Sequence, residues 1–418
     1  MHSSASKGPE WPVGPVSVPK EPLGRLFLRF LRFGALAWGG PVAQIAMIRQ
    51  EFVDEERWVT GEQFNRALAV YQILPGPEAH ELCVYFGMLS RGRAGGVLAG
   101  LGFMLPGFVL MFALSWAYVR YGLKGDALSA LFAAVQVAVA ALIVRAVIRI
   151  GGHVVTDKWL WVIAILATAA QLVGFHFGVI LIVAGVLYVL TRRARKELAW
   201  FAVALAGAAI VAPVAGGQSL AGLAALSSSG DLVETASRND VSLATLFWSG
   251  LKAGLLTFGG AYTVIPFLQR DAVAQGAWMS NTQFLDGLAL SGLLPAPLII
   301  FATFVGYLGG GPWGAVVLTL GIFLPAFSFT LVGHDALERM VHDPRIALFL
   351  AGVTAGVVGL IAGTTIALLT TSLTSFEALV LFAFALAALF VSSARLVVPA
   401  LIGAAAVWGL ARFFFLGS

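Results

Sequence analysis

Apolar residues occur along this chain in long runs, and charged residues collect in the short gaps between the runs. Thirteen runs are long enough to form helices of a membrane protein, in which a spanning helix needs about 20 apolar residues. They lie at 27–48, 62–90, 94–121, 126–150, 158–173, 175–191, 198–214, 243–269, 281–308, 312–333, 345–371, 376–392 and 395–416. The pattern predicts an all-α polytopic membrane protein with about 13 hydrophobic helical segments.

The composition strengthens this prediction. Of the 418 residues, 59% are hydrophobic and 11% are charged, whereas a soluble domain carries about 25% charged residues. A soluble protein is therefore excluded, and the lipid bilayer is the expected environment. The net charge of +5 does not indicate nucleic acid binding, because basic residues favour alternate loops by about three to one, as in membrane proteins. This bias places the N-terminus in the cytoplasm and the C-terminus outside.

The second half of the chain repeats the first. A shift of 220 residues places Arg32, Gly34, Gly39 and Gly40 on Lys252, Gly254, Gly259 and Gly260, and Pro75-Gly76-Pro77 on Pro295-Ala296-Pro297; a shift of 219 places Leu105-Pro106-Gly107 on Leu324-Pro325-Ala326. Because seven runs precede the second repeat, it would lie upside down in the membrane. Such inverted repeats are typical of secondary transporters, whose substrate site lies near the membrane midplane. The alternative is that duplication merely enlarged a scaffold.

These matches divide the chain into four parts. Residues 1–24 contain five prolines and no apolar run, which predicts a disordered cytoplasmic tail rather than a signal peptide. The first repeat covers 25–197, an extra helix and a Gly- and Ser-rich linker cover 198–241, and the second repeat covers 242–418.

Helix breakers interrupt the first two runs of each repeat. They are Gly39-Gly40-Pro41 and Pro75-Gly76-Pro77 in the first repeat, and Gly259-Gly260 and Pro295-Ala296-Pro297 in the second. A broken helix is tolerated in a bilayer only where it is buried in protein or lines a watery cavity. The helix that starts after a break presents free N–H groups, which bind anions. The breaks therefore predict an anion site, unless they are only kinks that shape the bundle.

Charged and polar side chains near the breaks are the candidates for that site. We expect cations at Arg32, Lys252 and Arg66, and hydrogen-bond donors at Gln44, Gln72, Thr257 and Tyr262. Two alternatives stay open: Arg32 reaches the cytoplasmic interface, and Arg66, which aligns with Asp286, forms a structural salt bridge with it. Glu78 and Glu81 share a helix face and are candidates to carry a coupled proton, with Glu78 otherwise a simple helix cap. Their counterparts are apolar, which confines proton-handling carboxylates to the first half.

Enzyme motifs are missing from the chain. His80-Glu81 begins like a zinc-protease motif, but position 84 is Val, so the second ligand is absent. Gly217-Gln218-Ser219 fails as a nucleophile elbow because position 221 is Ala. There is no phosphate-binding loop, and the single Cys83 excludes an intramolecular disulfide and a Cys-rich metal site. A second polar group is expected to be solvated surface: His334, Asp335, Glu338 and His342. We expect no cofactor, no metal and no enzymatic activity.

With these residues assembled, the chain resembles the long, two-domain members of the chromate ion transporter family. In the first repeat the resemblance rests on Phe33-Gly34, Trp38-Gly39-Gly40, Leu74-Pro75-Gly76-Pro77-Glu78-Ala79 and Leu105-Pro106-Gly107. In the second it rests on Thr257-Phe258-Gly259-Gly260-Ala261-Tyr262 and on Leu290-Ser291-Gly292-Leu293-Leu294-Pro295-Ala296-Pro297. One departure is Ala296, where the family often has Gly. The resemblance implies gradient-coupled efflux of chromate, a tetrahedral dianion, across a bacterial inner membrane, and hence chromate resistance.

The sequence thus predicts a secondary active transporter for a tetrahedral oxyanion. The first alternative is a sulfate or molybdate transporter, because these anions share the shape and charge of chromate. Less favoured are a passive channel and an intramembrane enzyme built on His80, Glu78 and Glu81. The sequence leaves a homodimer open.

Overall fold

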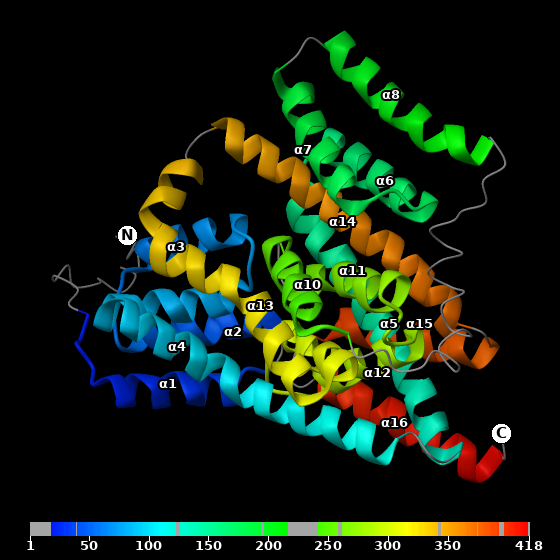
Figure 1. Cartoon of the computed structure of the whole chain (residues 1–418), viewed down its shortest axis with the longest axis horizontal. Coiled ribbons are helices and arrows are strands. Elements are labelled where there is room, and N and C mark those ends of the chain that lie inside the picture. The colour runs from blue at the N-terminus through cyan, green and yellow to red at the C-terminus, as the bar shows by residue number, and fades with distance from the viewer. Residues whose placement is uncertain are drawn as a thin grey trace, which may run out of the picture.

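The computed structural model describes residues 18–38, 40–122, 126–193, 196–215, 241–257, 261–341, 344–373, 375–392 and 397–416, and every element in these ranges is helical. The first half contains α1 (Leu23–Ala35), α2 (Gly40–Arg49), η1 (Gln50–Glu55), α3 (Gly61–Ile73), α4 (Glu78–Tyr121), α5 (Asp126–Val154), α6 (Lys158–Val173), α7 (Phe177–Arg193) and α8 (Lys196–Ala215). The second contains α10 (Leu243–Leu255), η2 (Ala261–Thr263), α11 (Val264–Gln269), η3 (Arg270–Gln275), α12 (Asn281–Gly292), η4 (Leu298–Ile300), α13 (Phe301–Val341), α14 (Pro344–Ser372), α15 (Phe376–Val391) and α16 (Val397–Leu416) (Figure 1).

Within the described residues, five helical segments are long and apolar enough to cross a membrane: Glu78–Tyr121, Ala130–Val154, Leu298–Val332, Arg345–Thr370 and Val397–Phe415. The thirteen predicted runs do not each form one helix. The run at 27–48 is split between α1 and α2, and the ring of Phe30 in α1 stacks on that of Phe52 in η1 at 5.7 Å. The expected break at Pro75-Gly76-Pro77 separates α3, which ends at Ile73, from α4, which begins at Glu78, whereas Gly40 and Pro41 of the other expected break form the first turn of α2. The membrane character is confirmed, and the count of 13 helices is not.

The predicted tail is ordered at its end. The backbone N–H of Glu21 donates to the Ser90 hydroxyl at 3.2 Å, and the Arg29 guanidinium forms an ion pair with the Glu21 carboxylate at 2.5 Å. Helix α1 already begins at Leu23, so ordered structure begins before residue 25. Residues 1–17 and the linker at 216–240, which includes Gly217-Gln218-Ser219, lie outside the described residues, as do His342 and the side chains of His334, Asp335 and Glu338.

Helices α4 and α13 are each folded back on themselves. The backbone leaves helical geometry at Gly92 and at Gly311, whose φ angles of +61° and +60° are left-handed. In both hairpins a short limb lies against a long one, because Gly87 touches the carbonyl of Gly95 and Gly306 touches that of Gly314. A Cβ atom has no room at these contacts. The same hairpin turn therefore occurs in both halves, at positions 219 residues apart.

The hairpin turn offers a clean stability test. A Cβ on Gly92 would meet nothing within 4 Å, so Gly92→Ala should cost only backbone strain, about 1–3 kcal/mol, because a φ of +61° with a ψ of −154° is essentially restricted to Gly. Thermal unfolding in detergent should show a lowered midpoint. Gly92→Asn should lose a similar amount, because this ψ lies outside the left-handed helical region that Asn tolerates. A much smaller loss in Gly92→Asn than in Gly92→Ala would contradict the strain argument.

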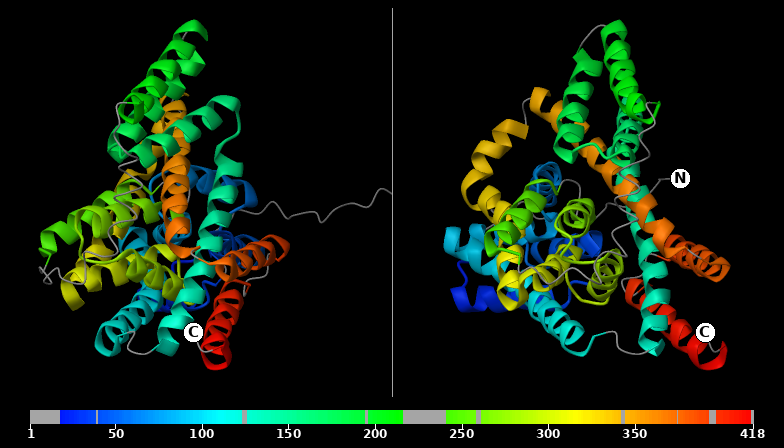
Figure 2. Two further views of the ribbon diagram at one scale, coloured as in Figure 1. Left: turned by 90° about the vertical axis from the view of Figure 1, so that its right-hand side faces the viewer. Right: turned by 45° about the vertical axis from the view of Figure 1, so that its right-hand side comes forward.

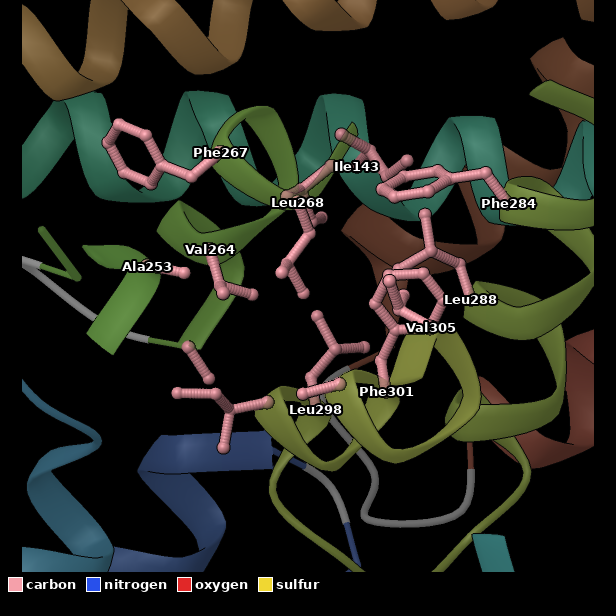
Figure 3. Packing of buried hydrophobic residues seen from close by; sticks show 14 of the residues in the cluster. Ile143, Ala253, Val264, Phe267, Leu268, Phe284, Leu288, Leu298, Phe301 and Val305 are labelled. Atoms are coloured by element: carbon pink, nitrogen blue, oxygen red, sulfur yellow. The ribbon is translucent and has the colours of Figure 1, made fainter. Parts of the chain in front are cut away.

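The two halves pack through matching contacts. α1 packs on α4 in the first half, α10 packs on α13 in the second, and α4 packs against α13 between the halves. Side chains from α5, α10, α11, α12 and α13 share one apolar core, including Ile143, Leu268, Phe284 and Phe301 (Figure 3). Helices α6, α7 and α8 lie in the upper part of Figure 1, and Figure 2 shows them from two further directions. Long α14 packs against α5, α6 and α7, and α5 also packs against α12, α15 and α16. Helix α5 of the first half therefore lies among helices of the second half.

Candidate functional site

The helix breaks of the two halves touch each other. The backbone N–H of Gly76 in the first half donates a hydrogen bond to the carbonyl of Thr257 in the second at 2.8 Å. The Thr257 hydroxyl donates within its own helix to the Ala253 carbonyl at 2.6 Å. The breaks are therefore buried in protein, as a break at membrane depth requires.

The breaks at Gly76 and Ala296 each contact a long helix of the other half. A Cβ placed on Gly107 would lie 2.5 Å from the Cβ of Ala296, and a Cβ placed on Gly76 would lie 3.2 Å from the Cβ of Ala326. Each contact thus joins a Gly of the first half to an Ala of the second half. The departure at Ala296 is explained by this pairing, because its opposite residue is Gly.

The space beside the breaks comprises two neighbouring parts that share lining residues. The larger part has a volume of about 490 Å³, and its lining includes Pro41, Gln72, Glu78, Arg149, His153 and Tyr262. The smaller part, of about 70 Å³, is lined by Trp38, Gly40, Arg145, Arg149, Tyr262 and Ala296, among others. Both parts share Pro41, Ala146, Arg149 and Tyr262, and together they are called the central cavity below.

Helix α5 supplies the positive charge of the central cavity. Arg145, Arg149 and His153 follow one another at intervals of four residues, which places them on one helix face. The Arg145 guanidinium donates only a long hydrogen bond of 3.5 Å to the Ser392 carbonyl. Among the described residues neither arginine forms an ion pair with a carboxylate. Two uncompensated guanidinium groups therefore face the cavity lined by the breaks.

The acidic candidates lie at the start of α4. Glu78 lines the central cavity and is 9% exposed. Glu81 is fully buried, and neither of its carboxylate oxygens has a hydrogen-bond partner among the described residues. It lies against the first break, since a Cβ on Gly76 would be 2.8 Å from its Oε1. Such a carboxylate is costly to keep ionised in an apolar interior.

Several predicted site residues gather around the central cavity. Gly40, Gln72, Glu78 and Tyr262 line it, and Pro75, Gly76, Pro77, Thr257, Pro295 and Pro297 form the breaks themselves. Gln44 is buried, and its amide donates to the Ala37 carbonyl at 3.0 Å, where α1 gives way to α2. Gly39, Gly259 and Gly260 lie outside the described residues.

The three predicted cations are not brought together. Arg32 lines a different cavity with Glu51 and Glu55, and Trp38 lines both this one and the central cavity. Lys252 forms an ion pair with Asp271 at 2.8 Å. Arg66 is 64% exposed beside Glu62, at 3.4 Å. Their roles in anion binding stay predictions.

The alternative salt bridge between Arg66 and Asp286 is wrong, because Asp286 is fully buried and accepts hydrogen bonds from Tyr118 and Gln136 instead.

His80 is placed differently from the cavity residues. It is fully buried, with its ring centroid 4.9 Å from that of Phe323 and 4.7 Å from that of Phe327. It is not among the residues that line the central cavity. The grouping of His80 with Glu78 and Glu81 beside one cavity, on which the enzyme alternative rested, is therefore not found.

Arg145 and Arg149 are not among the site residues predicted from the sequence. The signal that would have found them is their four-residue spacing at the end of an otherwise apolar run, continued by His153.

Known proteins match the chain over nearly its whole length. The family model described as chromate transporter matches residues 24–191 and again residues 244–410. A chromate transport protein of Pseudomonas aeruginosa is 57% identical over 84% of this chain and 81% of its own length. A second chromate transport protein, from Cupriavidus metallidurans, is 30% identical over 95% of both chains. No solved structure matches. The chain belongs to the chromate transporter family.

Proposed function

We propose that this protein is a secondary active transporter that exports chromate across the inner membrane of a bacterium and thereby confers chromate resistance. The observation that carries the proposal is that Arg145 and Arg149 face one cavity together with the helix breaks of both halves. Relatives named as chromate transport proteins support the choice of anion.

The chemistry of the central cavity suits a tetrahedral dianion. An arginine guanidinium binds two oxygens of an oxyanion at once and stays charged at any physiological pH. Two of them neutralise two negative charges. The Tyr262 hydroxyl and the Gln72 amide add neutral donors at the cavity wall. Sulfate and molybdate have the same shape and charge, so they are the competing substrates.

The position of the cavity supports an outward direction. Its lining continues to His153 and Val154 at the end of α5 and to Ala347 near the start of α14. The basic-residue bias, counted over the thirteen runs of the sequence, favours the cytoplasm for these helix ends. An anion would therefore be taken up from the cytoplasmic side before release on the other.

The repeat supports alternating access. Two inverted halves that meet at a midplane site can rock against each other and expose the site to one side at a time. The hydrogen bond from Gly76 to Thr257 crosses this junction. Glu78 lines the larger part of the central cavity together with Arg149, so its carboxylate is the candidate for a proton exchanged with the anion. Glu81 lies one helical turn further along α4.

The test is uptake of labelled chromate by proteoliposomes that contain the purified protein. Accumulation against the chromate gradient is expected when a pH gradient is imposed, and a protonophore should abolish it. Unlabelled sulfate and molybdate serve as competitors. Flux that follows only the chromate gradient would indicate a channel, and flux of sulfate without chromate would change the substrate.

A further inference from the structure

Asp286 is a buried carboxylate that joins the two halves away from the central cavity. It lies on α12 and is fully buried in the apolar core. Its Oδ2 accepts a hydrogen bond from the Tyr118 hydroxyl of α4, and its Oδ1 accepts one from the Gln136 amide of α5, both at 2.8 Å. One acidic side chain of the second half is thus held by two neutral donors of the first.

No described cation compensates this carboxylate. The charged residues and histidines with described side chains on helices packed against α12 are Glu78, His80, Glu81, Arg91, Arg93 and Arg120 on α4, Arg145, Arg149 and His153 on α5, and Arg412 on α16, and the described side chains of α13 add none. None of them forms an ion pair with Asp286, and Arg412 pairs with Glu377 at 3.1 Å. An ionised carboxylate with no cation partner is costly in an apolar interior, and two neutral hydrogen bonds offset only part of that cost. A proton removes the charge.

We propose that Asp286 is a second proton-binding site, which gains and loses a proton during the transport cycle. The proton binds to one carboxylate oxygen of Asp286, and no other covalent bond of the protein forms or breaks. The ionised carboxylate only accepts hydrogen bonds, whereas the protonated acid also donates one. The new O–H group needs an acceptor, which the Tyr118 hydroxyl oxygen or a reversed Gln136 amide can supply, and the contact between the halves would change with it.

Helix α5 links this site to the anion. Gln136 precedes Arg145 by nine residues on α5, a rise of about 13 Å along a helix. The same rigid element therefore carries a donor to Asp286 and both arginines of the central cavity. The inference rests on the proposed transport function, because a proton at Asp286 would bias the position of the helix that carries the anion-binding groups. It also places a proton-handling carboxylate in the second half.

The test variant is Asp286→Asn, which has the same shape. Its side-chain oxygen still accepts from Tyr118, and a reversed Gln136 amide accepts from its new N–H group, so the link between the halves is kept. In proteoliposomes the variant should exchange external for internal chromate as the unmodified protein does, but it should lose accumulation driven by a pH gradient. Unchanged pH-driven accumulation in Asp286→Asn would overturn the proposal.

Tyr118→Phe is the comparison variant, because it removes one hydrogen bond to Asp286 and keeps the carboxylate. It should shift the pH dependence of accumulation without abolishing accumulation. An equal loss in Tyr118→Phe and Asp286→Asn would assign Asp286 a structural role only.

A readout independent of transport separates this inference from the proposed function. Infrared difference spectra of the purified protein between acidic and alkaline pH should contain a protonated-carboxyl band that Asp286→Asn lacks. Absence of that difference overturns the proton site even if chromate is transported. Its presence in a protein that moves no chromate supports the proton site and overturns the transport function alone.

Discussion

Chromate binding is expected to weaken by about tenfold to a hundredfold when Arg149 is replaced by Gln, since a hydrogen bond to a charged group contributes about 1.5–3 kcal/mol. Arg149 lines both parts of the central cavity and has no ion-pair partner among the described side chains. The double variant Arg145→Gln/Arg149→Gln should abolish measurable transport, because it leaves a dianion without counter-charge in an apolar environment. Labelled chromate uptake and chromate-dependent thermal stabilisation measure flux and binding separately.

The matched control for this experiment is Arg66→Gln. It removes the same charge from a side chain that is 64% exposed beside Glu62, and transport should persist. Lys252→Met is the informative comparison, because Lys252 is paired with Asp271. If Lys252→Met abolished transport in a folded protein while Arg149→Gln did not, the anion site would lie with the cations predicted from the sequence.

The second large effect is expected from Gly107→Ala. The added methyl group would lie 2.5 Å from the Cβ of Ala296, and overpacking of this kind costs about 1–3 kcal/mol. The thermal midpoint in detergent should fall. Adding Ala296→Gly should restore most of the loss, because it removes the atom that the new methyl group meets.

Gly152→Ala provides the reference for this pair. Gly152 lies within helix α5, and a Cβ there would meet nothing within 4 Å. Gly152→Ala should therefore be neutral or slightly stabilising. Two residues in contact should show a coupling energy in a double-mutant cycle. Purely additive effects of Gly107→Ala and Ala296→Gly would show that the two positions do not touch.

The features that were predictable from the sequence are those set by neighbouring residues. Apolar runs predict helices, and Pro75-Gly76-Pro77 predicts a helix end because proline removes a backbone donor. The repeat was visible because equivalent glycines are required at equivalent close contacts: Gly34 touches the Phe103 carbonyl, and Gly254 touches that of Ile322.

The features that were missed depend on contacts between distant segments. Arg145 and Arg149 face the central cavity only because α5 lies beside Tyr262 and the break at Pro41, and no linear pattern encodes that proximity. Lys252 has no basic neighbour in sequence, yet Asp271, which lies 19 residues later, pairs with it in space. Charged side chains at equivalent positions of two repeats also need not lie close together, since a residue of the same half can neutralise each of them.

The exchanged Gly and Ala at the junction have a consequence for the history of this gene. Two copies of the first half alone would bring Gly76 against Gly107 and leave a gap, while two copies of the second would bring Ala296 against Ala326 and crowd two methyl groups together. Each half fits the other better than it fits itself. The duplicated units have thus become complementary, and splitting the gene should yield a functional transporter only when both fragments are expressed together.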